Sequence, residues 1–151
     1  MQIPAARICF PEEDRKKLLK QNDGILKSGQ LTLGEHTKEF EQRFAEYVGT
    51  KYAVAVNSGT SALEIILRAL DIDGSSVIVP TNTFFATPAS VIHAGGKVTF
   101  ADVTDNLCLD TESLKQSISD DTKAVIVVHI GGDNFIFEDI VKCSGINIPI
   151  I

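Results

Sequence analysis

From Ala53 onward, short apolar runs alternate with amphipathic stretches, and this alternation restricts the fold more than any other feature of the sequence. The apolar runs lack a polar face, as strands buried on both sides do, and the intervening stretches space their apolar residues as helices do. We predict strands at 53–56, 77–79, 98–103 and 124–130, and helices near 61–70, 88–94, 111–118 and 135–143. A final apolar run, 146–151, is expected to begin a fifth strand. The pattern therefore predicts an α/β fold of three αβα layers around a mostly parallel sheet.

The first fifty residues are expected to form a separate helical segment. One helix begins after Pro11 with an acidic first turn and ends at Ser28 and Gly29. A second helix, at 37–48, ends before Gly49, and a short loop that contains Thr32 and Gly34 joins the two. We therefore divide the chain into a helical segment, 1–50, and an α/β domain, 51–151.

Composition excludes several classes of partner. The formal net charge is −6, so neither a nucleic-acid groove nor an anionic membrane surface is expected. No stretch approaches the roughly 20 apolar residues that span a bilayer. The three cysteines, Cys9, Cys108 and Cys143, are far apart and indicate buried thiols in a reducing cytoplasm rather than a disulfide framework or a metal site.

Small polar residues occupy the junction between the first predicted strand and its helix. The tetrapeptide Ser58, Gly59, Thr60 and Ser61 follows Asn57. Backbone N–H groups at a helix N-terminus, with serine hydroxyls and a glycine that admits close approach, form a site for phosphate. The alternative is that these residues only cap the helix, through a capping box of Ser61 and Glu64. The junction lacks the lysine of a Walker loop.

Two aromatic residues follow the next predicted strand. Ligands of open α/β sheets bind at the carboxyl ends of the strands, so Phe84 and Phe85 are placed to cover a flat heterocycle. Core packing is the alternative for both rings. The acidic pair Asp102 and Asp105 follows another strand, and a polar turn explains it without a catalytic role.

Together these stretches resemble the DegT/DnrJ/EryC1/StrS family of sugar aminotransferases, which use pyridoxal phosphate and have the type I aminotransferase fold. The resemblance begins at Leu31 and runs to the end of the chain. It rests on these segments in the family's order: LTLGEHTKEFEQRFAEYVGTKYAVAVNSGTSAL, VIVPTNTFFATPASVIHAGGKVTFADV, LDTESL and TKAVIVVHIGG. It implies that 51–151 is an incomplete cofactor-binding large domain.

The resemblance also assigns roles to residues. It implies that Ser58, Gly59, Thr60 and Ser61 bind the cofactor phosphate and that Phe84 stacks on the pyridine ring, whereas Phe85 is expected to face the core. His129 is expected to be structural or adjacent to the cofactor. No catalytic residue and no metal ligand is assigned.

Two parts of the family's site are not found in this sequence. In the family an aspartate that pairs with the pyridine nitrogen, and a lysine that binds the cofactor covalently, follow a run like the one at 146–151. The sequence therefore resembles a truncated transaminase, and this chain alone is not expected to catalyse the reaction.

The resemblance implies a parent enzyme that transfers an amino group from glutamate to a nucleotide-linked keto-sugar in surface polysaccharide synthesis. Later segments and the neighbouring subunit build most of the sugar site, to which Thr32 and Gly34 are weak candidates. A second hypothesis is a non-catalytic remnant that self-associates and binds at most phosphate. A Rossmann-like nucleotide-binding domain is a third, although the junction has only one glycine.

The sheet order of the family places the second, third and fourth predicted strands side by side and leaves 53–56 without a neighbour. We therefore expect homo-oligomers, dimers among them, that form through exposed strands.

Overall fold

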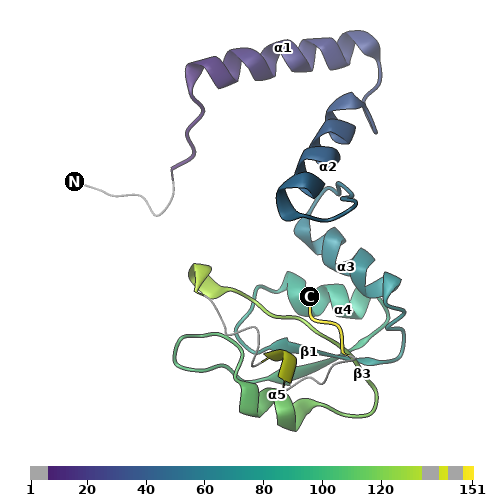
Figure 1. The fold of residues 1–151 in the computed structure, drawn as a ribbon, viewed down its shortest axis with the longest axis vertical. Helices are drawn as coiled ribbons and strands as arrows, with labels where there is room; N and C mark the ends of the chain where they lie inside the picture. Colours follow the sequence, from purple (N-terminus) through teal and green to yellow (C-terminus); the bar gives the residue numbers. More distant parts are fainter. Residues whose placement is uncertain (1–6, 134–139, 143–147) are drawn as a thin grey trace, which may run out of the picture. The chain divides into compact units, whose positions relative to one another are not determined.

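The computed structural model describes residues 7–133, 140–142 and 148–151 (Figure 1). It divides into two compact units, Met1–Ala55 and Val56–Ile151.

The first unit consists of two helices and an extended segment. Helix α1 spans Glu12–Ser28 and ends at Gly29, whose φ of 71° is the left-handed conformation that glycine adopts without strain. Helix α2 spans Glu35–Val48 and ends in the same way at Gly49, with φ 74°. The predicted C-terminal ends of both helices are confirmed. The N-terminus of α2 lies two residues earlier than expected, at Glu35.

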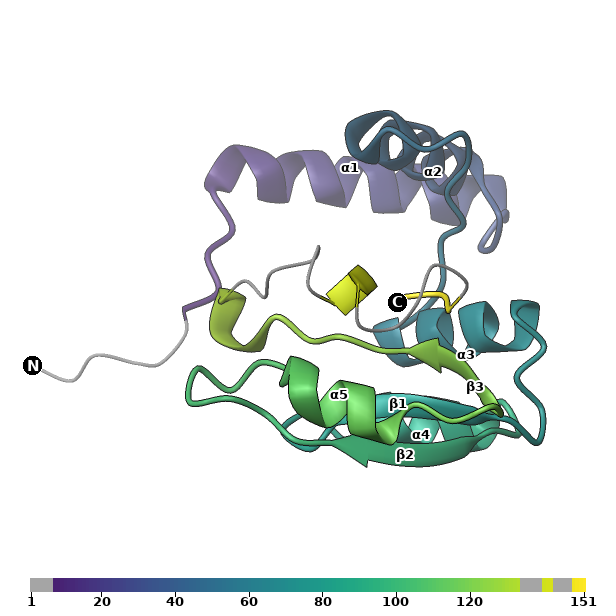
Figure 2. The ribbon, with the colours of Figure 1, turned by 60° about the horizontal axis from the view of Figure 1, so that its bottom comes forward.

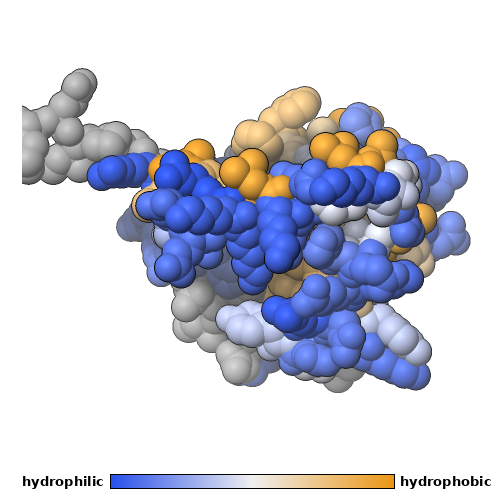
Figure 3. Space-filling model, turned by 90° about the horizontal axis from the view of Figure 1, so that it is seen from above, coloured by the Kyte–Doolittle hydropathy of each residue, from blue (hydrophilic) through white to orange (hydrophobic). Residues whose placement is uncertain are grey.

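The two helices of the first unit leave many apolar side chains exposed. No residue of α1 is buried, and Ala45 is the buried residue of α2. Exposed apolar side chains of the unit include Leu19, Leu26, Phe40, Phe44 and Tyr47. Figure 3 shows apolar side chains, in orange, lying among hydrophilic ones on one face of the molecule.

The second unit contains a parallel three-stranded sheet in the order β2-β1-β3. Its strands are β1 (Ser76–Pro80), β2 (Lys97–Ala101) and β3 (Thr122–Val125). These are the second, third and fourth predicted strands, and their predicted adjacency is confirmed. Figure 2 shows β1 and β2 side by side, with α5 over one face of the sheet.

Helices cover both faces of this sheet, as the alternating pattern predicts. They are α3 (Gly59–Ala69), α4 (Ala86–His93) and α5 (Thr111–Ser117). Val77 and Val79 of β1 pack with Leu67 of α3 and Val91 of α4 in one core. Side chains alternate along a strand, so Ile78 faces the opposite core, with Leu114 of α5. The αβα layering is confirmed.

The predicted strand at 53–56 is wrong, because these residues join no sheet in the part of the chain that the structure describes. Val54 is 78% exposed. The backbone N–H of Ala55 donates to Oε1 of Glu41 on α2, at 2.8 Å, instead of to a neighbouring strand. An apolar run becomes a strand only where a second strand lies beside it.

Two other strands are shorter than predicted, since β2 ends at Ala101 and β3 ends at Val125. After β2, Val103 forms an isolated antiparallel bridge with Leu109, and the turn between them contains Asp105. After β3, residues Ile130–Gly132 form a 3₁₀ turn in which Gly131 has φ 63°.

The last residues begin a further strand, as predicted. Ile150 forms a parallel bridge with Val125. The N–H of Ile151 donates to the carbonyl of Val125, and the N–H of Val127 donates to the carbonyl of Ile151, each at 2.9 Å. Of the helix predicted at 135–143, residues 140–142 are helical and Ile140 is buried in the core with α5. Residues 134–139 and 143–147, Cys143 among them, lie outside the described residues.

Candidate functional site

The polar junction forms the start of α3, two residues earlier than predicted. Ser58 is the N-cap residue, with extended backbone angles, and its Oγ accepts from the backbone N–H of Ser61 at 3.1 Å. The predicted capping box of Ser61 and Glu64 is therefore wrong. Glu64 pairs with Arg68 one turn later, with Nε to Oε1 at 2.9 Å, because residues four apart on a helix are neighbours.

Three side chains of the junction form one hydrogen-bond network. The Ser58 hydroxyl donates to Oγ of Ser61 at 3.1 Å, and the Ser61 hydroxyl donates to Oδ1 of Asn57 at 2.8 Å. Both serine hydroxyl protons are thus used within the turn. The network holds the turn in one shape without using the first two amides of the helix.

Those two amides are open to a ligand. Within the described residues, no hydrogen-bond acceptor lies against the N–H groups of Gly59 or Thr60. A Cβ added at Gly59 would meet nothing within 4 Å, so there is open space beside the backbone. Adjacent outward N–H groups at the positive end of an eleven-residue helix suit a phosphate dianion. The donor set therefore fits the phosphate of pyridoxal phosphate.

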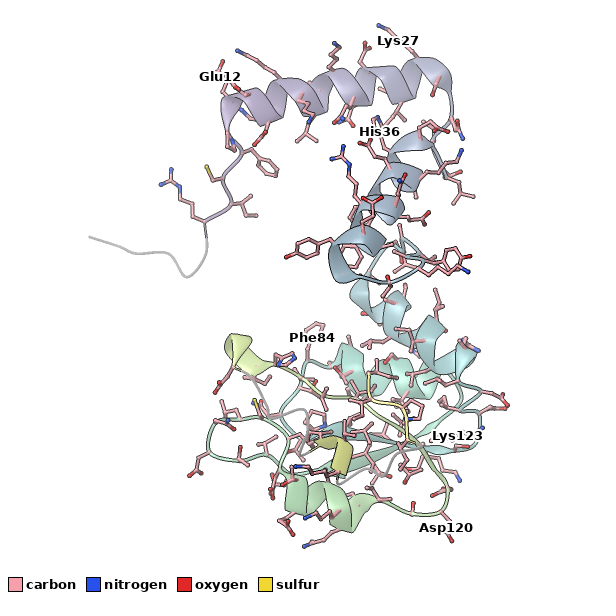
Figure 4. All side chains as sticks on the ribbon, in the orientation of Figure 1. Glu12, Lys27, His36, Phe84, Asp120 and Lys123 are labelled. Carbon is pink, nitrogen blue, oxygen red and sulfur yellow. The ribbon has the colours of Figure 1, made fainter. Side chains whose placement is uncertain are left out.

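Phe84 and Phe85 lie in the segment between β1 and α4. Phe84 is 78% exposed, and Figure 4 shows its ring projecting from this segment away from the sheet. The ring is open to a ligand and takes no part in core packing.

The expectation that Phe85 faces the core is wrong, because Phe85 is also 78% exposed. Thr87 takes the buried position instead, and its hydroxyl oxygen accepts from Thr83 at 2.8 Å. Thr87 is the second residue of α4, so its buried side chain lies in the first turn of the helix. Phe85, with helical backbone angles, is the residue that precedes α4.

Helices α3 and α4 pack together in the same direction. Nη2 of Arg68, near the end of α3, donates to the carbonyl of His93, the last residue of α4. Glu64 of α3 also lies beside His93, with Oε2 3.8 Å from Nδ1. Since the carboxyl ends of the two helices meet, their N-termini lie toward the same edge of the sheet. The junction at 57–61 and Phe84 lie at or just before these N-termini, and are thus on the side where α/β proteins bind ligands.

Other polar residues near this edge have structural partners. Asp102 accepts from the N–H of Val103 and, at 3.3 Å, from the hydroxyl of Thr81, whereas Asp105 lies in the predicted polar turn. His129 is exposed, with Nδ1 3.3 Å from the carbonyl oxygen of Asp133. The described residues include no group of three or more His, Cys, Asp or Glu side chains placed to hold a metal ion.

The side chain of Asn57 was not among the predicted site residues, although it belongs to the network. An amide side chain directly before a run of small polar residues could have indicated from the sequence that Asn57 takes part in the turn. Elsewhere, none of the described helices has the length and apolar character needed to cross a membrane.

Comparison with known proteins gives a consistent result. A model of the DegT/DnrJ/EryC1/StrS aminotransferase family matches residues 12–151. Spore coat polysaccharide biosynthesis protein SpsC of Bacillus subtilis is 40% identical over 121 residues, which cover 79% of this chain and 31% of SpsC.

Solved structures are similar in fold and in sequence. The putative sugar aminotransferase Spr1654 from Streptococcus pneumoniae, in its PLP form, superposes with a TM-score of 0.85 at 32% identity, covering 95% of this chain and 36% of that one. A GDP-4-keto-6-deoxymannose-3-dehydratase with a trapped PLP-glutamate geminal diamine gives 0.85 at 31% identity, with 99% and 40% covered. The chain thus spans between about 31% and 40% of the length of these relatives.

Proposed function

This chain belongs to the DegT/DnrJ/EryC1/StrS aminotransferase family, and we propose that it is the N-terminal part of a pyridoxal-phosphate-dependent sugar aminotransferase. The parent would transfer an amino group, from glutamate, to a nucleotide-linked keto-sugar in the synthesis of a surface polysaccharide. The observation that carries the proposal is the pair of open amides at the start of α3, in a chain that superposes on the PLP form of a sugar aminotransferase.

The donor set supports a phosphate seat at the junction. The N–H groups of Gly59 and Thr60 would bind the phosphate oxygens, and Ser58 and Ser61 would hold the turn in shape. The exposed ring of Phe84 would cover one face of the pyridine ring and exclude water from it. When bound, the cofactor supplies the electron sink for chemistry at the amino-bearing carbon.

The substrate part of the proposal draws on the named relatives. One is a spore coat polysaccharide biosynthesis protein, and another is a dehydratase of a GDP-linked keto-sugar that was trapped with glutamate. A nucleotide-linked keto-sugar and glutamate are therefore the substrates we propose for the parent enzyme.

We further propose a helical segment, 1–50, followed by the cofactor-binding domain, 51–151. The division of the structure after Ala55 supports a boundary near this position. We propose a homo-oligomer, in the form of a dimer, because large apolar side chains such as Phe44 and Val54 are exposed. Cys108 is buried as predicted, but the prediction is wrong for Cys9, which is exposed. Neither thiol is in a disulfide, which supports a reducing compartment, the cytoplasm.

Binding measurements on the purified chain test the phosphate seat. We expect pyridoxal phosphate to bind more tightly than pyridoxal, which lacks the phosphate, and inorganic phosphate to compete with it. Equal affinity for the two forms, or no binding, would favour the remnant hypothesis. The appearance of a cofactor that borohydride attaches to one specific lysine would contradict the expectation that no lysine here has the covalent role.

Gly59→Pro is the sharpest variant for this test. Proline at the first helical position removes one N–H donor while keeping the helix start, and the extended backbone of Ser58 suits a following proline. We expect it to lower the affinity for phosphate about tenfold, as for a lost hydrogen bond to a charged group. Thr111→Pro, at the first position of α5, is the matched control and should leave binding unchanged.

A further inference from the structure

We infer that Thr87 is a positioning residue for Phe84, because its hydrogen bonds hold the backbone that presents the Phe84 ring. The inference rests on the proposed function, in which that ring covers the pyridine of the cofactor. Thr87 itself is buried, with 6% of its surface exposed. Its effect on the cofactor would therefore pass through Phe84.

An exposed phenylalanine needs a backbone that is held in place. Phe84 and its neighbour Phe85 are each 78% exposed. Exposed aromatic surface is unfavourable in water, so a free loop would turn these rings toward the protein. The local sequence does not fix the turn either, since Thr87 lies in α4 directly before Pro88, where helical backbone angles are disfavoured. The conformation that presents Phe84 therefore depends on the contacts of this segment.

Thr87 supplies such contacts at two points. Its backbone N–H donates to the carbonyl oxygen of Phe84 at 2.9 Å. Its hydroxyl oxygen accepts from the hydroxyl of Thr83, the residue before Phe84, at 2.8 Å. One residue thus fixes both the carbonyl of Phe84 and the side chain that precedes it.

Further hydrogen bonds attach both ends of this segment to the second unit. At the start, the N–H of Thr81 donates to the carbonyl of Ala101, the last residue of β2, at 2.9 Å. At the other end, the hydroxyl of Ser90 donates to the carbonyl of Thr87 at 2.8 Å, and Ser90 is fully buried. The bond between Thr83 and Thr87 therefore attaches the residues around Phe84 to the buried side of α4.

Two substitutions at position 87 separate positioning from stability. Thr87→Val keeps the branched shape of the side chain but removes the oxygen that accepts from Thr83. Thr83 is half-buried, so its hydroxyl is free to turn to water, and we expect the urea unfolding midpoint to stay nearly unchanged. Thr87→Ser keeps the oxygen but removes a buried methyl group, so we expect the midpoint to fall.

Binding should follow the opposite order. We expect Thr87→Val to lower the affinity for pyridoxal phosphate about three- to tenfold, the effect of one neutral hydrogen bond. Thr87→Ser should bind pyridoxal phosphate as the unmodified chain does. Inorganic phosphate has no ring for Phe84 to cover, so its affinity should be unchanged in both variants. A residue with only a structural role would instead lose affinity for both probes as it loses stability.

Thr99→Val is the matched control, because it also breaks a bond between two hydroxyl groups. Oγ1 of Thr99 lies 2.7 Å from Oγ of Ser76, the first residue of β1, whereas Phe84 comes after the end of this strand. This variant should leave both affinities unchanged. Thr83→Val removes the donor of the inferred bond and should match Thr87→Val. The double variant should bind no more weakly than either, since both changes break the same bond.

Three binding results would overturn the inference and leave the proposed function standing. They are an unchanged affinity of Thr87→Val for pyridoxal phosphate, an equal loss in Thr87→Ser, and a loss in Thr87→Val that is as large for inorganic phosphate.

Hydrogen exchange tests the inference without any ligand. If the unmodified chain binds neither probe, the proposed function fails, and exchange at the backbone amide of residue 87 decides the inference separately. This amide donates to Phe84, so it should exchange faster in Thr87→Val than in Thr87→Ser. Equal exchange in the two variants would show that the hydroxyl bond does not hold Phe84.

Discussion

Oε1 of Glu41, on α2, accepts a hydrogen bond from the backbone N–H of Ala55, fourteen residues later, at 2.8 Å. Both residues are partly buried. A side-chain carboxylate here takes the place that a strand carbonyl would occupy in a sheet. This contact gives the apolar run, up to Ala55, a hydrogen-bond partner in the first unit without strand pairing.

Replacing Glu41 by alanine should leave the Ala55 amide without a partner. We expect the free energy of unfolding of the first unit to fall by about 1 to 2 kcal/mol, the range for a hydrogen bond to a charged group near the surface. Hydrogen exchange at the Ala55 amide, followed with urea unfolding, measures the effect. Glu41→Gln keeps an acceptor and should recover part of the protection. Glu46→Ala, on the same helix, is the control and should leave exchange at Ala55 unchanged.

Two glycines should respond to alanine in opposite directions. Gly95 has φ 88°, and a Cβ there would lie 2.2 Å from Oδ1 of Asp73, so Gly95→Ala should destabilise the second unit by about 2 kcal/mol. Gly24 lies inside α1 with nothing within 4 Å of its added Cβ. Gly24→Ala should stabilise α1 by about 0.5 to 1 kcal/mol. Thermal unfolding followed by circular dichroism compares them, and a stabilising Gly95→Ala would contradict the structure.

Asp110 should contribute to stability as the cap of α5. Its two carboxylate oxygens accept from the backbone N–H groups of Glu112 at 3.2 Å and Ser113 at 3.4 Å. Asp110→Ala should therefore cost about 1 kcal/mol in urea unfolding, and Asp110→Asn should cost less because asparagine is also a good cap. Equal stability of the alanine variant and the unmodified chain would show that the cap does not contribute to the free energy of unfolding.

The first turn of α2 should show a pH-dependent ion pair. Nζ of Lys38 lies 2.7 Å from Oε1 of Glu35, and this hydrogen bond and the lysine charge hold the pKa of the Glu35 carboxyl below its ordinary value. A carboxyl whose pKa is lowered by folding adds stability above its unfolded pKa, and this is lost as the pH falls through the folded pKa. Lys38→Met should return the pKa of Glu35 toward its ordinary value in a carbon-13 titration. An unchanged titration midpoint would rule out the pair in solution.

The same pair raises the pKa of Lys38. Its contribution is present below the unfolded lysine pKa and is lost as the pH rises through the raised one. Both groups are fully exposed, so we expect a spectroscopic effect at Glu35 and no measurable change in the unfolding midpoint of Lys38→Met.

Much of the candidate site could be located from the sequence. The switch from an apolar run to helical spacing around Ser58 places a helix N-terminus there, and the structure confirms it within two residues. The polar turn predicted for Asp102 and Asp105 is found at Asp105, whereas Asp102 lies just before the bridge residue Val103. The start of α3 was misjudged because Ser58 and Ser61 are both good caps, and only the hydrogen bond from Ser61 N–H to Ser58 Oγ distinguishes them.

The two phenylalanines show a different limit. Phe84 and Phe85 have the same side chain, so their order along the chain cannot tell which one is buried, and in the structure neither is. The buried position belongs to Thr87, which loses little by burial because its hydroxyl has a partner in Thr83.

The sequence by itself determined the local elements of this protein. These are the proline and glycine at helix ends, the cap at Asp110 and the alternation of strand and helix. Each depends on neighbours within a few residues, so it forms independently of how the rest of the chain packs. Only the tertiary structure decided which apolar runs pair. The run at 77–79 lies between two strands, whereas the equally apolar run at 53–56 is held by Glu41. A strand obtains its hydrogen bonds from residues far away in sequence, so pairing is a property of the whole fold and not of the run itself.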